Sequence, residues 1–268
     1  MGQLTFALAG SKKLCGVLEL GKESSFYWYR KSAEQGNDIA QVALGKHLSN
    51  SWVSGDEEEA FGWYQKAADQ GNSDAKFGLA QLYERGSYSK KIPRNDELAL
   101  KLYREAAAQE HRMSYVVLSQ IYEDGSNGVE KDEAVAAYWY RKAADKGSAF
   151  AQFQLAKMLQ KGRGVEKNDV EARLWYGKSA DNGFLFAKTN LAIMLRDGIG
   201  GPADEDLALQ FFLETAHAGE SNAQYEIGRI YLLGLHGVLP DQKVAESWFK
   251  KSNERRRPVV LEEFEAMR

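Results

Sequence analysis

The stretch Glu133–Val165, EAVAAYWYRKAADKGSAFAQFQLAKMLQKGRGV, decides the fold. Its first half places alanine and aromatic residues at helical spacing, and its second half does the same with alanine, leucine and methionine. Gly147 follows the first half, and Gly162 and Gly164 follow the second, where helices end because glycine adopts the left-handed backbone conformation without a steric clash. The stretch predicts two amphipathic helices that bury their apolar faces only against further pairs of the same kind.

The same pattern recurs along the whole chain. Pairs of large apolar residues in the first helix of each unit follow one another at spacings of 35, 39, 37, 36, 36 and 37 residues. They are Trp28-Tyr29, Trp63-Tyr64, Leu102-Tyr103, Trp139-Tyr140, Trp175-Tyr176, Phe211-Phe212 and Trp248-Phe249. A serine or alanine stands three positions before each pair, which lets helices pack closely. A period this constant predicts stacked helical hairpins, with the aromatic pairs in the core.

The second helix of each unit and the loop after it repeat as well. A large residue is followed by a small one at Leu44-Gly45, Leu79-Ala80, Leu118-Ser119, Leu155-Ala156, Leu191-Ala192 and Ile227-Gly228. An Asp or Asn stands near the start of each later first helix, at Asp56, Asn95, Asp132, Asn168, Asp204 and Asp241. These side chains can accept hydrogen bonds from the free amides of the first helical turn. We therefore interpret them as helix caps.

The repeated residues resemble a known family. The pattern A-x-x-W-Y-x-K-A-A-x-x-G, followed by A-Q-x-x-L-A/G-x-x-Y-x-x-G-x-G-V, is similar to the Sel-1-like repeat, a relative of the tetratricopeptide repeat. The resemblance covers about residues 24–253 and implies an all-α fold, a right-handed α/α superhelix or solenoid of helix-turn-helix repeats of about 36 residues. It also implies a scaffold for protein–protein contacts, frequently bacterial and without enzymatic activity in most members.

Three segments are expected. Residues 1–23 resemble a degenerate N-terminal capping segment, residues 24–253 form the solenoid of six to seven units, and residues 254–268 form a C-terminal capping helix. With both caps the chain should contain about fifteen helices. The third unit departs from the pattern, with Glu110 in place of the turn glycine and a longer loop that contains Lys90 and Lys91.

Composition excludes several classes of protein. The net charge of -3 gives no broad basic surface for nucleic acid, and there is no apolar run long enough for a membrane span. Cys15 is the single cysteine, so a disulfide framework within the chain is impossible. We expect a soluble protein, either cytoplasmic or, if an export signal preceded this sequence, periplasmic or exported. The oligomeric state is left open.

No pattern in the sequence indicates catalysis, a metal or a cofactor. The four histidines, His47, His111, His217 and His236, lie on separate units without metal-ligand spacing. The glycine-rich loop at 198–201 follows a helix and lacks the lysine of phosphate-binding loops. The prediction is a chain that is not an enzyme and needs no cofactor.

A partner surface is expected on the second helices, which by resemblance line the concave side of the superhelix. Their leucine stripe faces the other helix layer, so the opposite stripe remains for a partner. We call it the second-helix stripe; it consists of Gln81, Arg85, Gln120, Asp124, Gln154, Lys157, Lys161, Asn190, Ile193, Asp197, Glu226 and Arg229, continued by Gly78, Val117 and Leu233. Its mixed charge suits a folded protein or an extended peptide better than nucleic acid.

Three functions remain open. The chain is a binding scaffold or adaptor, an antitoxin-like immunity protein that neutralises a secreted bacterial effector, or an enzyme-associated or enzymatic repeat protein. The register also predicts that Trp139 is a core residue whose replacement by alanine costs about 3–5 kcal/mol.

Overall fold

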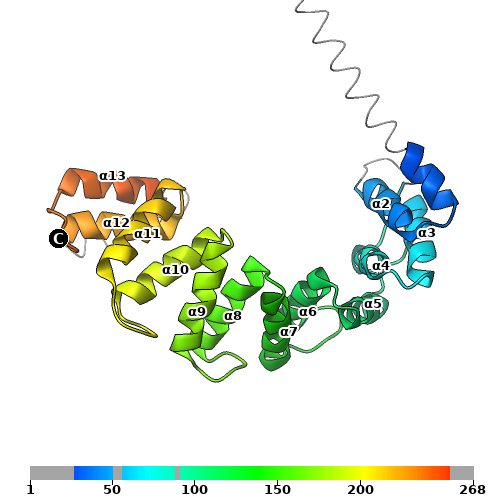
Figure 1. The fold of residues 1–268 in the computed structure, drawn as a ribbon, viewed down its shortest axis with the longest axis horizontal. Helices are drawn as coiled ribbons and strands as arrows, with labels where there is room; N and C mark the ends of the chain where they lie inside the picture. Colours follow the sequence, from blue (N-terminus) through cyan, green and yellow to red (C-terminus); the bar gives the residue numbers. More distant parts are fainter. Residues whose placement is uncertain (1–26, 51–55, 88–90, 254–268) are drawn as a thin grey trace, which may run out of the picture. The chain divides into compact units, whose positions relative to one another are not determined.

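The fold is all-α throughout the part of the chain that the structure describes. A computed structural model describes residues 27–50, 56–87 and 91–253, and these ranges contain helices and no strands (Figure 1). Residues 27–34 are helical. The helices that follow are α2 (Asp38–Ser49), α3 (Asp56–Asp69), α4 (Ser73–Arg85), α5 (Asp96–Ala108), α6 (Arg112–Asp124), α7 (Glu133–Asp145), α8 (Ala149–Lys161), α9 (Asp169–Asp181), α10 (Leu185–Arg196), α11 (Glu205–His217), α12 (Ser221–Leu233) and α13 (Gln242–Asn253).

The predicted repeat solenoid is confirmed. The odd-numbered helices from α3 to α13 are the predicted first helices, and the even-numbered helices are the second helices. The predicted capping segments at 1–23 and 254–268, together with Cys15 and Lys90, lie outside the described residues.

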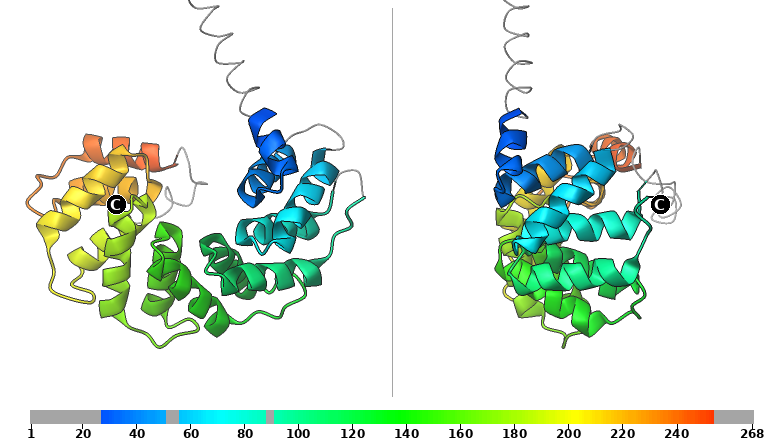
Figure 2. Two further views of the ribbon diagram at one scale, coloured as in Figure 1. Left: turned by 45° about the vertical axis from the view of Figure 1, so that its right-hand side comes forward. Right: turned by 90° about the vertical axis from the view of Figure 1, so that its right-hand side faces the viewer.

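The chain divides into two compact units. One contains the residues up to Ile121 together with Gly125–Glu130, and the other contains Tyr122–Asp124 and the residues from Lys131 onward. In the first unit α2 packs on α3, α3 on α4 and α4 on α5. In the second, each helix from α7 to α12 packs on the next (Figure 2). Each unit is therefore a stack of helical hairpins.

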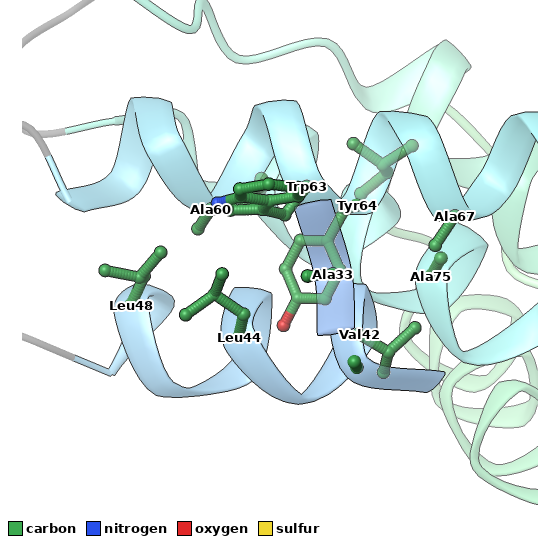
Figure 3. Close-up of a cluster of buried hydrophobic side chains, with 12 residues drawn as sticks. Ala33, Val42, Leu44, Leu48, Ala60, Trp63, Tyr64, Ala67 and Ala75 are labelled. Carbon is green, nitrogen blue, oxygen red and sulfur yellow. The ribbon is translucent and has the colours of Figure 1, made fainter. Parts of the chain in front are cut away.

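The core of the first unit shows how the repeated residues fit together. Trp63 and Tyr64 of α3 lie over Leu44 and the other apolar residues of α2 (Figure 3). The Tyr64 ring also packs on two glycines, because a Cβ atom added at Gly45 or Gly78 would lie 2.7 or 2.6 Å from it. Gly78 is thus buried against this ring, although it also borders the hollow that the stripe residues Gln81 and Arg85 line.

The second aromatic of each pair is the more deeply buried one. Tyr103, Tyr140, Tyr176 and Phe212 have no exposed surface. The Tyr140 hydroxyl donates to the Glu123 carboxylate at 2.6 Å. Trp139 is only half-buried, so the prediction that it is a fully buried core residue is wrong. In this pair the fully buried aromatic residue is Tyr140.

Other letters of the repeat have structural roles too. In several repeats the lysine three positions after tryptophan lies over the indole ring, at 4.2 Å for Lys66 on Trp63 and 3.9 Å for Lys178 on Trp175. The buried Gln152 side chain donates to the Ala144 carbonyl at 3.1 Å. Its oxygen accepts a hydrogen bond from Asn182 at 2.9 Å, which joins one repeat to the next.

The expected helix caps are confirmed at five of the six positions; the residues just before the sixth, Asp56, lie outside the described ranges. Asn95, Asp132, Asn168, Asp204 and Asp241 each accept a hydrogen bond from a backbone amide two or three residues onward. Asp56 is the first residue of α3. These acids and amides therefore start helices.

Glu110 is a strained position whose replacement should stabilise the protein. Its φ of 61° lies in the left-handed region, where the other repeats have a glycine such as Gly147. A side chain in this conformation costs about 1–2 kcal/mol, part of which the greater freedom of an unfolded glycine offsets. We expect Glu110→Gly to raise the free energy of unfolding by about 0.5–1 kcal/mol in urea titrations. Glu110→Ala keeps the strain, so an equal gain from alanine would contradict this explanation.

Glu123 should make stability depend on pH. Burial acts to raise the pKa of Glu123, but hydrogen bonds from Tyr140 and Arg163 and the charge of Arg163 bring it below its ordinary value of 4.5. The stabilisation is complete above the unfolded-state pKa and is lost as pH falls through the lower folded-state pKa. We expect the melting temperature to fall less between pH 6 and pH 3 in Glu123→Gln than in the wild type, whereas the exposed Glu166→Gln should retain the wild-type dependence.

Candidate functional site

The second-helix stripe lies on five helices, α4, α6, α8, α10 and α12. None of its twelve predicted binding residues is fully buried. The exposed ones are Gln81, Arg85, Gln120, Asp124, Lys161 and Asp197, and the half-buried ones are Gln154, Lys157, Asn190, Ile193, Glu226 and Arg229. The large apolar residue of each helix, a leucine or Ile227, is buried or half-buried, so the stripe side chains remain accessible to a partner.

In the first unit two stripe residues line a hollow. Gln81 and Arg85 border a space of about 240 Å³ that also contacts Tyr64 and Glu84. The Arg85 guanidinium donates to the Ser49 carbonyl at 3.3 Å and pairs with a carboxylate of the same unit, that of Glu57, at 3.0 Å. Arg85 is therefore held in place as well as partly exposed.

In the second unit the charges at the end of α10 and in the middle of α12 form a network. Arg196, which is not among the predicted stripe residues, pairs with Asp197 and Glu226, each at 2.7 Å. Arg229 also pairs with Glu226, at 3.1 Å. The hydrogen bond from Arg196 lowers the pKa of Asp197. The positive charge of Arg229 is thus largely compensated by neighbours.

The two lysines of α8 differ from this network. The Lys157 ammonium contacts the Gln154 side-chain oxygen at 3.3 Å and lies 5.3 Å from the centre of the Phe153 ring. Lys161 is exposed at the end of the helix. Within the described part of the chain neither lysine forms an ion pair, although the charge of Lys157 helps to lower the pKa of Glu123. They are therefore available to pair with an acidic partner.

The start of α10 is not among the surfaces predicted from the sequence, yet it carries exposed aromatic and aliphatic side chains. Phe184 occupies the capping position and makes no side-chain cap hydrogen bond, and Leu185 and Phe186 are 41% and 50% exposed. The signal was present: the letters GFLF stand where the preceding repeat has GSAF, with serine as the cap.

The described residues contain no candidate metal centre. No group of three or more His, Cys, Asp or Glu side chains there could hold a metal ion. His111 caps α6 and contacts Asp74 at 3.1 Å. None of the described helices combines the length and the apolar character that crossing a bilayer requires.

Comparison with known proteins identifies the repeat family to which these helices correspond. A family model described as Sel1 repeat matches residues 18–37, 38–72, 73–111, 113–148, 149–184, 185–220 and 221–255. Most matched blocks begin at or near a second helix, so each contains one second helix and the first helix that follows it.

Individual relatives come from bacteria and yeast. The chitin synthase regulator SKT5 of Saccharomyces cerevisiae is 28% identical over 185 residues, which are 68% of this chain and 21% of the yeast protein. A protective antigen of uropathogenic Escherichia coli with an SLR fold is 31% identical, with a TM-score of 0.78, over 86% of this chain and 49% of the antigen chain. A Sel1 repeat protein from Oxalobacter formigenes is 29% identical, with a TM-score of 0.66, over 82% of this chain and 88% of that one. The chain thus spans about a fifth of the yeast relative and about half of the antigen.

Proposed function

Because the chain belongs to the Sel1 repeat family, whose members generally mediate protein–protein interactions, we propose that it is a non-enzymatic adaptor that binds a protein or peptide partner. The partner contacts the second-helix stripe, and in the second unit it contacts Lys157, Lys161 and Arg229. The observation that carries the proposal is the pair of α8 lysines, which are accessible and form no ion pair among the described residues.

Charge supports this assignment. Core positions recur from repeat to repeat, whereas the stripe differs between α8, with two lysines, and α10, with Asn190, Ile193 and Asp197. A stripe whose charge changes along its length gives a partner orientation and register, because like charges repel wrong alignments.

The kind of partner distinguishes an adaptor from an immunity protein that neutralises a toxic effector. A neutraliser of a toxic effector would use the same surface in a tight complex, with Kd near or below about 1 nM. The yeast relative is by name a regulator of an enzyme, so an enzyme partner also suits an adaptor. Binding to a toxin encoded beside this chain would identify the immunity role.

Reversing charge on the stripe tests the proposal. The partner is recovered by affinity capture with the full chain, and its Kd is then measured by titration calorimetry. We expect Lys157→Glu to raise Kd about tenfold, equivalent to about 1.4 kcal/mol, and Arg229→Glu to raise it less because Arg229 is already paired. Lys142→Glu on the first helix α7 is the matched control and should leave Kd unchanged.

One outcome of these charge reversals would assign the partner contact to another part of the chain. If binding survived both reversals but fell when Lys90 and Lys91 were changed, the partner would contact the loop before α5 and the proposed surface would be wrong.

A further inference from the structure

The start of α10 lacks a side-chain cap and instead carries aromatic side chains that are partly exposed. In α8 the Ser148 hydroxyl caps the helix by accepting from the Ala151 amide, whereas the equivalent Phe184 of α10 makes no such bond. A serine, threonine or asparagine cap contributes about 1 kcal/mol. A position where the sequence departs from a local rule, as here at the missing cap, is a candidate functional position.

The side chains gathered there form an aromatic patch, defined as Phe153, Phe184 and Phe186. Ring centres are 5.0 Å apart for Phe153 and Phe184, and 5.7 Å apart for Phe184 and Phe186. The patch is anchored because Phe153 also lies 5.9 Å from the fully buried Tyr176 ring. Phe186 is 50% exposed, while Phe153 and Phe184 are half-buried. Rigid, partly exposed aromatic rings are typical anchor points of protein interfaces.

The surroundings of the patch are positively charged. The Lys157 ammonium lies 5.3 Å from the Phe153 ring, and Lys161 follows one turn later on the same helix. Lys188, beside the patch on α10, is already paired with Glu214 at 2.8 Å. Of these three lysines, Lys157 and Lys161 form no ion pair within the described residues, and both lie along α8, starting at the patch.

We propose that the aromatic patch, with Lys157 and Lys161, is a docking site for an extended acidic peptide segment anchored by one bulky apolar residue. The inference rests on the proposed adaptor function and specifies its partner. Along α8, Lys157 and Lys161 lie about 6 and 12 Å beyond Phe153 at 1.5 Å per residue. An extended peptide covers these distances in about two and four residues, and those side chains point to the same side. The segment therefore carries acidic residues two and four positions from its anchor.

Synthetic peptides test this spacing. The probe is a fluorescein-labelled peptide with one central phenylalanine, serines, and glutamates two and four positions away on both sides, so that either chain direction fits. One comparison peptide has the same composition with the glutamates one and three positions away, and another has lysines in place of the glutamates. We expect fluorescence anisotropy with the full chain to give a Kd for the probe at least about tenfold lower than for either comparison peptide, which is about 1.4 kcal/mol.

Variants assign the binding to the patch. Phe186→Ser and Lys157→Glu should each weaken probe binding by at least about fivefold, whereas Tyr138→Ser, which removes a 53% exposed aromatic of α7, should have no effect. Circular dichroism confirms that each variant is folded; Phe186→Leu, which keeps an apolar side chain, should retain most of the binding.

Three outcomes would overturn the inference. These are equal binding of the probe and the shifted-glutamate peptide, unchanged binding by Phe186→Ser, and a dimer of the full chain that Phe186→Ser dissociates, since a second copy would then cover the patch. If Lys157→Glu abolishes binding of the captured partner while Phe186→Ser does not, the adaptor function stands and only the peptide site fails.

Discussion

Replacing Tyr140 with alanine is expected to lower the free energy of unfolding by about 3–5 kcal/mol, the usual cost of emptying a large aromatic core site. Tyr140 has no exposed surface, and its ring lies 6.3 Å from the ring of Phe150. The change also removes the hydroxyl that donates to Glu123, which leaves a half-buried carboxylate with one hydrogen bond fewer. Urea unfolding followed by far-UV circular dichroism should show a clear drop in the midpoint.

The two preceding residues are matched controls on the same helix. Tyr138 is 53% exposed, so Tyr138→Ala should change the free energy of unfolding by less than about 0.5 kcal/mol. Trp139 is half-buried, and Trp139→Ala should give an intermediate loss. If Trp139→Ala were the most damaging of the three, the orientation of α7 described here would be incorrect.

Gly164 should be nearly as sensitive, for a different reason. Its φ is +65°, and a Cβ atom added there would overlap the backbone carbonyl of Glu133 at the start of α7. Backbone cannot move aside as a flexible side chain can, so the loop or the helix must shift. We expect Gly164→Ala to destabilise the protein by about 2–4 kcal/mol, from the left-handed conformation together with overpacking.

Gly147 separates these two causes. It also has a positive φ, +82°, but nothing lies within 4 Å of an added Cβ. Gly147→Ala should therefore cost only about 1–2 kcal/mol, the price of the backbone conformation. Equal melting temperatures for the two variants would show that the contact with Glu133 does not limit the loop. The same close approach recurs at Gly200, against the Asp169 carbonyl, but not at Gly128 or Gly237, where nothing lies within 4 Å of an added Cβ.

The period of the aromatic pairs was sufficient to predict the helices, their order and their caps. Helix starts at Asn95 or Asp132 follow from local chemistry, since a side chain near a helix start must satisfy the free amides. Assignment of core positions worked for the same reason, because small and large residues alternate in fixed register. Helix starts and core positions therefore depend on residues that are close together within one repeat.

Features that depend on the contact between repeats could not be predicted. Trp139 and Tyr140 are adjacent large aromatics, and which of them is fully enclosed depends on how α7 is turned against its neighbours. Gly78 matched the spacing of the stripe, but the ring of Tyr64 from another helix covers it. The aromatic patch brings together α8 and the start of α10, so it is visible only once those helices are packed.

Lysine footprinting of the complex tests the central claim, that a partner binds the second helices. The full chain is acetylated with and without its captured partner, and the modification of each lysine is measured by mass spectrometry. The adaptor proposal predicts that the partner slows acetylation of Lys157 and Lys161 on α8, while the exposed Lys142 and Lys178 on the first helices α7 and α9 react as before. Protection of Lys142 and Lys178 with none at Lys157 and Lys161 would place the partner on the first helices and contradict the account.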